Sequence, residues 1–181
     1  MPPPAVRQID VSVAEPFGTL VSEGWLRMVL ECALRTALPA EQTGQVGLLI
    51  ADDETVRELN RVYRGLDEVT DVLSFSATHA GHWEGDIPQE GEPEMAEMPF
   101  PEFILPPEEL PPLGEVIVSY PQTLRQAEQR GEPVERELAL LLVHGVLHLV
   151  GHDHLEPEET ELMQARERAA LAEVFQVGTG D

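Results

Sequence analysis

The chain of 181 residues has the size of one ordinary domain and is long enough to bury a hydrophobic core. Its formal net charge of −23 repels nucleic-acid phosphates at long range. A nucleic-acid-binding function would therefore require the few basic residues to be gathered in one place. The sequence has neither the roughly 20 apolar residues of a membrane span nor an apolar signal region, and its single cysteine excludes an internal disulfide. We therefore expect one cytoplasmic domain over residues 1–181, with no membrane partner.

The first third of the chain alternates between strand and helix patterns. Residues 8–13 alternate in polarity and residues 45–51 form a short apolar run, so each predicts a strand. Ser22 is a typical N-cap for a helix that ends near Leu38, just before Pro39. Asp52 or Asp53 is the expected N-cap of a second helix over residues 54–64.

The second predicted helix has two distinct faces. Apolar side chains recur on one face, and three arginines recur on the opposite face at positions i, i+4 and i+7. The apolar set is Val56, Leu59 and Tyr63, and the basic set is Arg57, Arg61 and Arg64. Such a stripe is often only a solvated surface. In so acidic a chain it is nevertheless the best candidate for phosphate contacts, so we name Arg57 and Arg61 as candidate substrate-binding residues.

Residues 78–112 differ in composition from the rest of the chain. They are rich in glutamate and proline, poor in aliphatic residues and without a basic residue. A segment of low hydrophobicity and high net charge cannot bury enough surface to fold alone. We expect a mobile acidic insert, and its length leaves open whether it is functional or simply disordered.

The remaining elements complete an α+β fold. Strands are expected at residues 72–75 and 113–119, on either side of the insert, followed by helices at 121–130, 134–150 and 156–175. Helix 134–150 is apolar around almost its whole circumference, which is typical of a buried central helix. The expected architecture is a small mixed four-stranded sheet packed with helices around this buried helix.

Three histidines on and after the central helix have metal-ligand spacing. His144 and His148 are four residues apart, so both can reach one ion from the same helical face. His152 continues the four-residue step, but eight helical residues rise about 12 Å, too far for one ion to bridge from His144. Gly151 can end the helix in a left-handed conformation and turn the chain so that His154 becomes the third ligand.

Three neutral imidazoles predict one Zn²⁺ ion with an open fourth position, as in catalytic zinc sites. Asp153 is a candidate for a carboxylate that orients a ligand histidine, although a simple turn residue fits that position as well.

Two families share this histidine spacing. The metzincin peptidase pattern H-E-x-x-H-x-x-G-x-x-H is matched except at its glutamate, where Gly145 stands. That glutamate is the general base of the peptidases, so peptide hydrolysis would need another base. The run from His144 to His154 more closely resembles the signature of the YbeY family, metal-dependent bacterial endoribonucleases, in which glycine follows the first histidine.

Two further stretches support the YbeY resemblance. Residues 60–75 resemble a second family motif, in which the arginine matching Arg64 is functional and faces the metal cleft. Residues 113–119 resemble a strand motif, with Glu115 where aspartate is usual. The resemblance implies a zincin-like fold and Arg64 as a catalytic residue.

The same resemblance implies a function. It points to a zinc-dependent endoribonuclease specific for single strands, acting in ribosomal RNA maturation and ribosome biogenesis. The expected partners are ribosomal RNA and small-subunit ribosomal proteins, with no role for DNA. The alternative is a ribosome-assembly binding module whose zinc is mainly structural.

Overall fold

The computed structural model describes residues 5–77, 110–152 and 156–177. Within these residues a short 3-10 helix, Glu15–Phe17, is the one element that the sequence patterns did not indicate, and the other elements confirm the expected order to within about two residues. The strands are β1 Arg7–Val13, β2 Gly44–Ala51, β3 Val72–Ser76 and β4 Pro112–Ser119, and the α-helices are α1 Glu23–Ala37, α2 Asp53–Arg64, α3 Tyr120–Arg130, α4 Val134–Leu149 and α5 Pro157–Val177.

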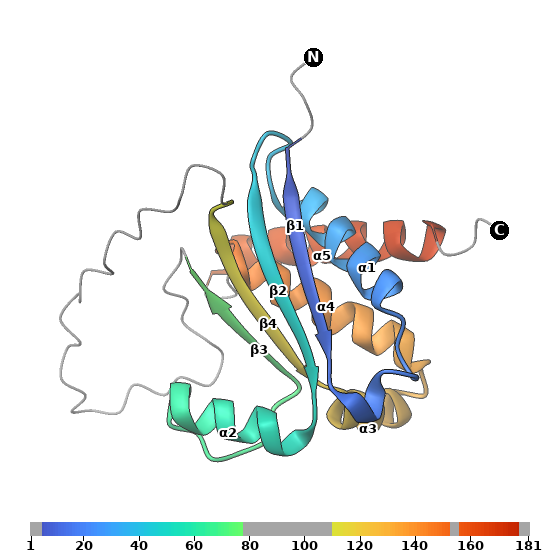
Figure 1. Cartoon of the computed structure of the whole chain (residues 1–181). Coiled ribbons are helices and arrows are strands. Elements are labelled where there is room, and N and C mark those ends of the chain that lie inside the picture. Colours follow the sequence, from blue (N-terminus) through green and yellow to red (C-terminus); the bar gives the residue numbers. More distant parts are fainter. Residues whose placement is uncertain (1–4, 78–109, 153–155, 178–181) are drawn as a thin grey trace.

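The four strands form the mixed sheet that the sequence predicts. Their order is β1-β2-β4-β3, in which β1, β2 and β4 are parallel and β3 is an antiparallel edge strand paired with β4. The carboxyl ends of the three parallel strands lie at the same end of the sheet, and α2 and α3 lie there as well (Figure 1). The chain enters both helices directly from β2 and β4.

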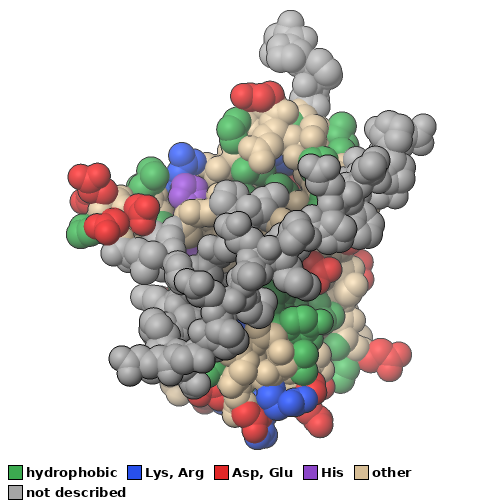
Figure 2. Space-filling view, turned by 90° about the vertical axis from the view of Figure 1, so that its left-hand side faces the viewer, with side chains coloured by type: hydrophobic (Ala, Val, Ile, Leu, Met, Phe, Trp, Pro, Cys, Tyr) green, Lys and Arg blue, Asp and Glu red, His purple; other side chains and the backbone are tan. Residues whose placement is uncertain are grey.

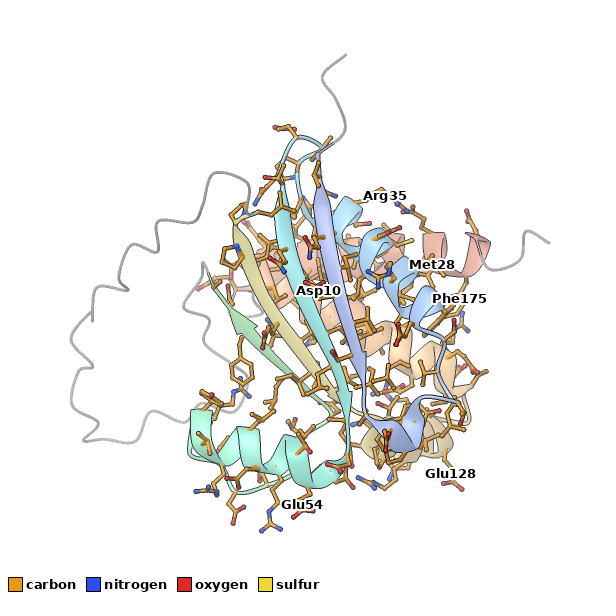
Figure 3. All side chains as sticks on the ribbon, in the orientation of Figure 1. Asp10, Met28, Arg35, Glu54, Glu128 and Phe175 are labelled. Atoms are coloured by element: carbon orange, nitrogen blue, oxygen red, sulfur yellow. The ribbon has the colours of Figure 1, made fainter. Side chains whose placement is uncertain are left out.

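The helices cover the two sheet faces unequally. Helices α1, α4 and α5 pack together on one face, and α4 contacts β3 and β4 (Figure 1). Helix α4 is buried along most of its length, as expected of a central helix. On the opposite face α2 covers only one end, so Asp10 of β1 remains exposed there and accepts hydrogen bonds from the side chains of Gln8 and Gln45 (Figure 3).

Local signals explain where the helices begin and end. The Ser22 hydroxyl accepts the Trp25 N–H at the start of α1, and the Asp52 carboxylate accepts the Thr55 N–H at the start of α2. Asp52 is therefore the N-cap, whereas Asp53 is the first helical residue. Gly65 ends α2 with φ of +70°, a conformation that favours glycine because other side chains would be strained.

The structure corrects one detail of the expected pattern on α2. The helical pattern predicts Tyr63 on the apolar face with Val56 and Leu59, but its side chain is 67% exposed, whereas Val56 is fully buried. The Tyr63 ring lies 5.3 Å from the ring of Phe75, centroid to centroid, on the sheet edge. Tyr63 therefore lies beside the edge strand β3 with most of its side chain open to solvent.

Most of the predicted acidic insert, residues 78–109, lies outside the described part of the chain. Strand β4 begins at Pro112, one residue earlier than expected, and the Pro111 carbonyl already accepts the Gln45 N–H. Proline is tolerated there because it opens the strand. Across the described residues, no helix combines the length and the apolar character that crossing a membrane requires.

Candidate metal and phosphate cleft

A cleft of about 290 Å³ opens between the end of α2, the start of β3 and the helices α4 and α5. Its walls bring together residues far apart in sequence. They are Arg64, Thr70, Asp71, Val72, Arg130, Glu137, Leu140, Leu141, His144, His148 and Glu167. Two of the three predicted zinc ligands therefore share one cavity with the predicted catalytic arginine.

The imidazoles of His144 and His148 converge as two ligands of one ion would. Their Nε2 atoms lie 3.0 Å apart, with the rings nearly perpendicular. Two nitrogens bound tetrahedrally to zinc at about 2.0–2.1 Å would be separated by about 3.3 Å. A small movement of either ring would suffice, so this pair fits a zinc ion.

Glu167 of α5 supports the first of these rings from behind. Its Oε2 atom lies 3.4 Å from Nδ1 of His144, on the side of the ring opposite to the converging nitrogens. A carboxylate at this position holds the ring orientation and favours the tautomer that carries its proton on Nδ1, so that the Nε2 lone pair can serve as a metal ligand. The candidate from sequence, Asp153, lies outside the described residues.

The predicted turn at Gly151 is confirmed. Helix α4 ends at Leu149, and Gly151 has φ of +93°. The Gly151 N–H donates to the His148 carbonyl and the His152 N–H donates to the Leu147 carbonyl, a pattern that closes a helix by reversing the chain.

The third predicted ligand, His154, lies outside the described residues, where it remains a prediction. Within the part of the chain that the structure describes, no three His, Cys, Asp or Glu side chains form a ligand set. His152, which helix geometry excludes as a ligand together with His144, is partly buried. Its pKa is lowered, mainly by burial and to a lesser extent by the nearby Arg166 guanidinium. The lowered pKa favours a neutral ring.

Gly145, which stands where peptidases have their glutamate, faces the sheet. A Cβ atom there would lie 2.8 Å from Cγ1 of Val116 and 3.1 Å from Oγ of Ser74. The Ser74 hydroxyl also donates to the Gly145 carbonyl at 3.0 Å. In this chain the position is a packing contact between α4 and the sheet, so it has no room for a catalytic carboxylate.

The three arginines of α2 do not act as one surface. Arg64 lines the cleft, whereas Arg57 and Arg61 line a separate groove on the outer side of the helix. Arg57 donates two hydrogen bonds to the Asp67 carboxylate, and Arg61 donates two to Glu58. Figure 2 shows acidic and basic side chains intermixed at the lower end of the molecule, the height at which α2 lies in Figure 1.

Four charged residues of the cleft were not anticipated from the sequence: Asp71, Arg130, Glu137 and Glu167. Their spacing carries no recognisable pattern, because they come from four different segments. The signal available for Glu137 was an acidic residue on a nearly all-apolar helix, seven positions before His144. Asp71 is fixed in place by hydrogen bonds from the Val72 N–H and the Gln126 amide.

Comparison with known proteins adds to this geometry. Residues 16–175 match the family described as "Endoribonuclease YbeY". A relative of that name from Dehalococcoides mccartyi is 39% identical over 170 residues, which is 94% of this chain and 98% of the relative. A second, from Roseiflexus sp., is 36% identical over 166 residues, or 91% of each chain. The solution structure of TM1509 from Thermotoga maritima has the same fold, with a TM-score of 0.50 at 22% identity and 96% coverage of both chains.

Proposed function

The chain belongs to the YbeY family of endoribonucleases, which are hydrolases, and from this premise we propose that it is a zinc-dependent enzyme that cleaves single-stranded RNA during ribosomal RNA maturation. Its activity would serve ribosome biogenesis in the cytoplasm, beside small-subunit ribosomal proteins. We propose a zincin-like arrangement in which α4 carries the metal ligands. Specificity for single-stranded ribosomal RNA rests on the family resemblance.

One observation carries the proposal: the facing Nε2 atoms of His144 and His148 share a cleft with Arg64. Neutral imidazole nitrogens suit zinc, and a guanidinium suits phosphate. We propose His154 as the third ligand, because the turn at Gly151 reverses the chain directly before it. The cleft thus pairs a cation site with a phosphate site.

A zinc ion held by these histidines would supply Lewis-acid polarisation of a phosphoryl oxygen and would lower the pKa of a water molecule. The chain's own residues supply the positioning. Glu167 keeps the His144 ring turned toward the ion, and Arg64 holds the scissile phosphate with a planar pair of N–H donors. Arg64 also offsets the negative charge that develops on that phosphate in the transition state.

Arg57 and Arg61 have a lesser role in this proposal. Both form ion pairs in which arginine and carboxylate are more than half exposed, and such pairs are worth only about 0–1 kcal/mol. A passing RNA phosphate can replace the carboxylate at little cost. We propose that these two arginines contact the RNA backbone outside the cleft.

The experiment that tests these roles compares Arg64→Ala with Arg57→Ala. Arg64→Ala should keep the fold and the zinc but lose about 2.7–4 kcal/mol of transition-state stabilisation, by analogy with a lost oxyanion donor, which is roughly a hundred- to thousandfold in turnover. Arg57→Ala should weaken RNA binding while leaving turnover at saturating RNA near normal. Equal small losses in both variants would remove the catalytic role of Arg64.

A further inference from the structure

Arg130 and Glu137 form an ion pair in the wall of the same cleft. Arg130 is the last residue of α3, Glu137 lies in the first turn of α4, and the turn at Gly131 brings them together. The Arg130 NH1 group donates to Oε2 of Glu137 at 3.0 Å. Neither residue belongs to the histidine motif or to the arginine stripe of α2.

This pair differs from the other arginine–carboxylate pairs of the described residues in its burial. The Glu137 side chain is 3% exposed, whereas the Arg130 side chain is 56% exposed. In the Arg57–Asp67 pair, by contrast, both side chains are more than half exposed. A buried carboxylate needs a cation beside it, so Glu137 holds Arg130 from the inside while the outer part of the guanidinium remains open to solvent.

In the part of the chain that the structure describes, the bond to Glu137 engages one nitrogen of the Arg130 guanidinium. A guanidinium has five N–H donors, and Glu137 receives its bond from the NH1 group. The other acids of the cleft already have donors of their own, because Asp71 accepts from Val72 and Gln126 and Glu167 faces His144. The exposed part of the Arg130 guanidinium can therefore donate hydrogen bonds to an anion that enters the cleft.

We infer that Arg130, held by Glu137, is a second phosphate-binding position in the cleft, which receives the backbone of a single-stranded RNA beside the phosphate at the histidines. Glu137 lies seven residues before His144 on α4, which corresponds to about 10 Å of helical rise. Because Arg130 is held at Glu137 and not beside His144, it is assigned a phosphate next to the scissile one. That the ligand is RNA rests on the proposed function. That Arg130 can bind a phosphate rests only on its exposed guanidinium in the cleft.

The test is equilibrium binding of a short labelled single-stranded RNA to the full-length protein in a His148→Ala background, which prevents turnover. Removing both charges with Arg130→Met/Glu137→Leu avoids leaving a buried carboxylate without its partner. This variant should bind RNA about tenfold more weakly or worse at low salt. The slope of log affinity against log salt should fall in magnitude by about 0.7, the value for one phosphate contact to a single strand. The loss should be similar for RNAs of different sequence, as a backbone contact requires.

Arg125→Ala is the matched control. Arg125 lies on the same helix, is similarly exposed and pairs with Asp53, but it does not line the cleft, so its removal should leave affinity and salt slope unchanged. If the double variant does not fold, Arg130→Lys tests the inference instead. Lysine keeps a positive charge beside Glu137 but lacks the planar pair of donors, so this variant should bind RNA about threefold more weakly or worse. Parent-like affinity and salt slope in a folded variant would overturn the inference. Because binding is measured without cleavage, failure of the nuclease proposal would appear separately, as a wild-type protein that binds RNA and leaves it uncut.

Discussion

Replacing Gly145 with alanine tests whether the position after the first histidine is a packing contact. The added methyl group would meet Cγ1 of Val116 at 2.8 Å and Oγ of Ser74 at 3.1 Å. Val116 is fully buried on β4, so it cannot move into solvent to relieve the contact. Helix α4 must shift away from the sheet or the valine must leave its preferred rotamer.

Two opposing effects determine the magnitude. Alanine is favoured over glycine in a helix interior by about 0.8–1.0 kcal/mol, whereas one extra methyl group in a well-packed core costs about 1–3 kcal/mol. We expect Gly145→Ala to lower the free energy of unfolding by roughly 1 kcal/mol, within a range from about 0 to 2 kcal/mol. Because His144 precedes this residue, zinc affinity should fall as well.

Urea unfolding of the metal-free protein measures this difference without a contribution from ligand binding. Gly24→Ala is the control, since its Cβ would have no neighbour nearer than 3.7 Å on α1, and it should be neutral or stabilising. In a Val116→Ala background, where the space is open, Gly145→Ala should become stabilising. A Gly145→Ala variant that is stabilised in the parent protein would refute the packing explanation.

Three further expectations concern the metal and the acidic segment. Glu167→Gln should weaken zinc binding about 10–100-fold, because the amide can no longer hold the His144 ring as a carboxylate does, while Glu161→Gln on the exposed side of α5 should have no effect in the same competition assay. Protons compete with zinc for imidazole nitrogen, so apparent zinc affinity should fall as pH drops below roughly 6.5, and an affinity that stayed flat from about pH 8 to pH 5 would exclude a histidine site. Replacing residues 78–109 with a short Gly-Ser bridge from Ala77 to Leu110 should leave the melting temperature nearly unchanged and strengthen RNA binding at low salt, with a gain that shrinks as salt screens charges over about 10 Å at 0.1 M. Unfolding on deletion would show that the segment packs on the core, and weaker binding would show that it is a contact surface.

The secondary structure was predictable because its signals are local. Ser22 and Asp52 cap helices through hydrogen bonds to residues only three positions away, and Gly65 ends one through its own backbone conformation. The turn at Gly151 was predictable for a similar reason: His144 and His152 lie too far apart on a continuous helix to bind one ion, and glycine can end a helix before His152. Such features depend on a few consecutive residues, so the sequence contains all the information needed to place them.

The charged surroundings of the histidines were not predictable in the same way. Glu167 reaches His144 from another helix, 23 positions later in the chain, and Arg130 meets Glu137 across a turn. The helical periodicity of α2 placed Arg57 and Arg64 on one face but could not show that this face divides between a cleft and an outer groove. These contacts between helices depend on how the elements pack, and the residue spacing within a single segment does not predict that packing.

Zinc analysis joined to an RNA cleavage assay, on the wild type and on His148→Ala, tests the proposed enzyme most directly. The wild type should bind one zinc ion and cleave single-stranded RNA, and chelation should abolish cleavage while leaving the protein folded. His148→Ala should remain folded, lose the zinc and leave the RNA intact. A His148→Ala protein that still cleaves, or a wild type that leaves RNA uncut and unfolds when zinc is removed, would contradict a catalytic metal, and the second result would favour a structural zinc in a binding module.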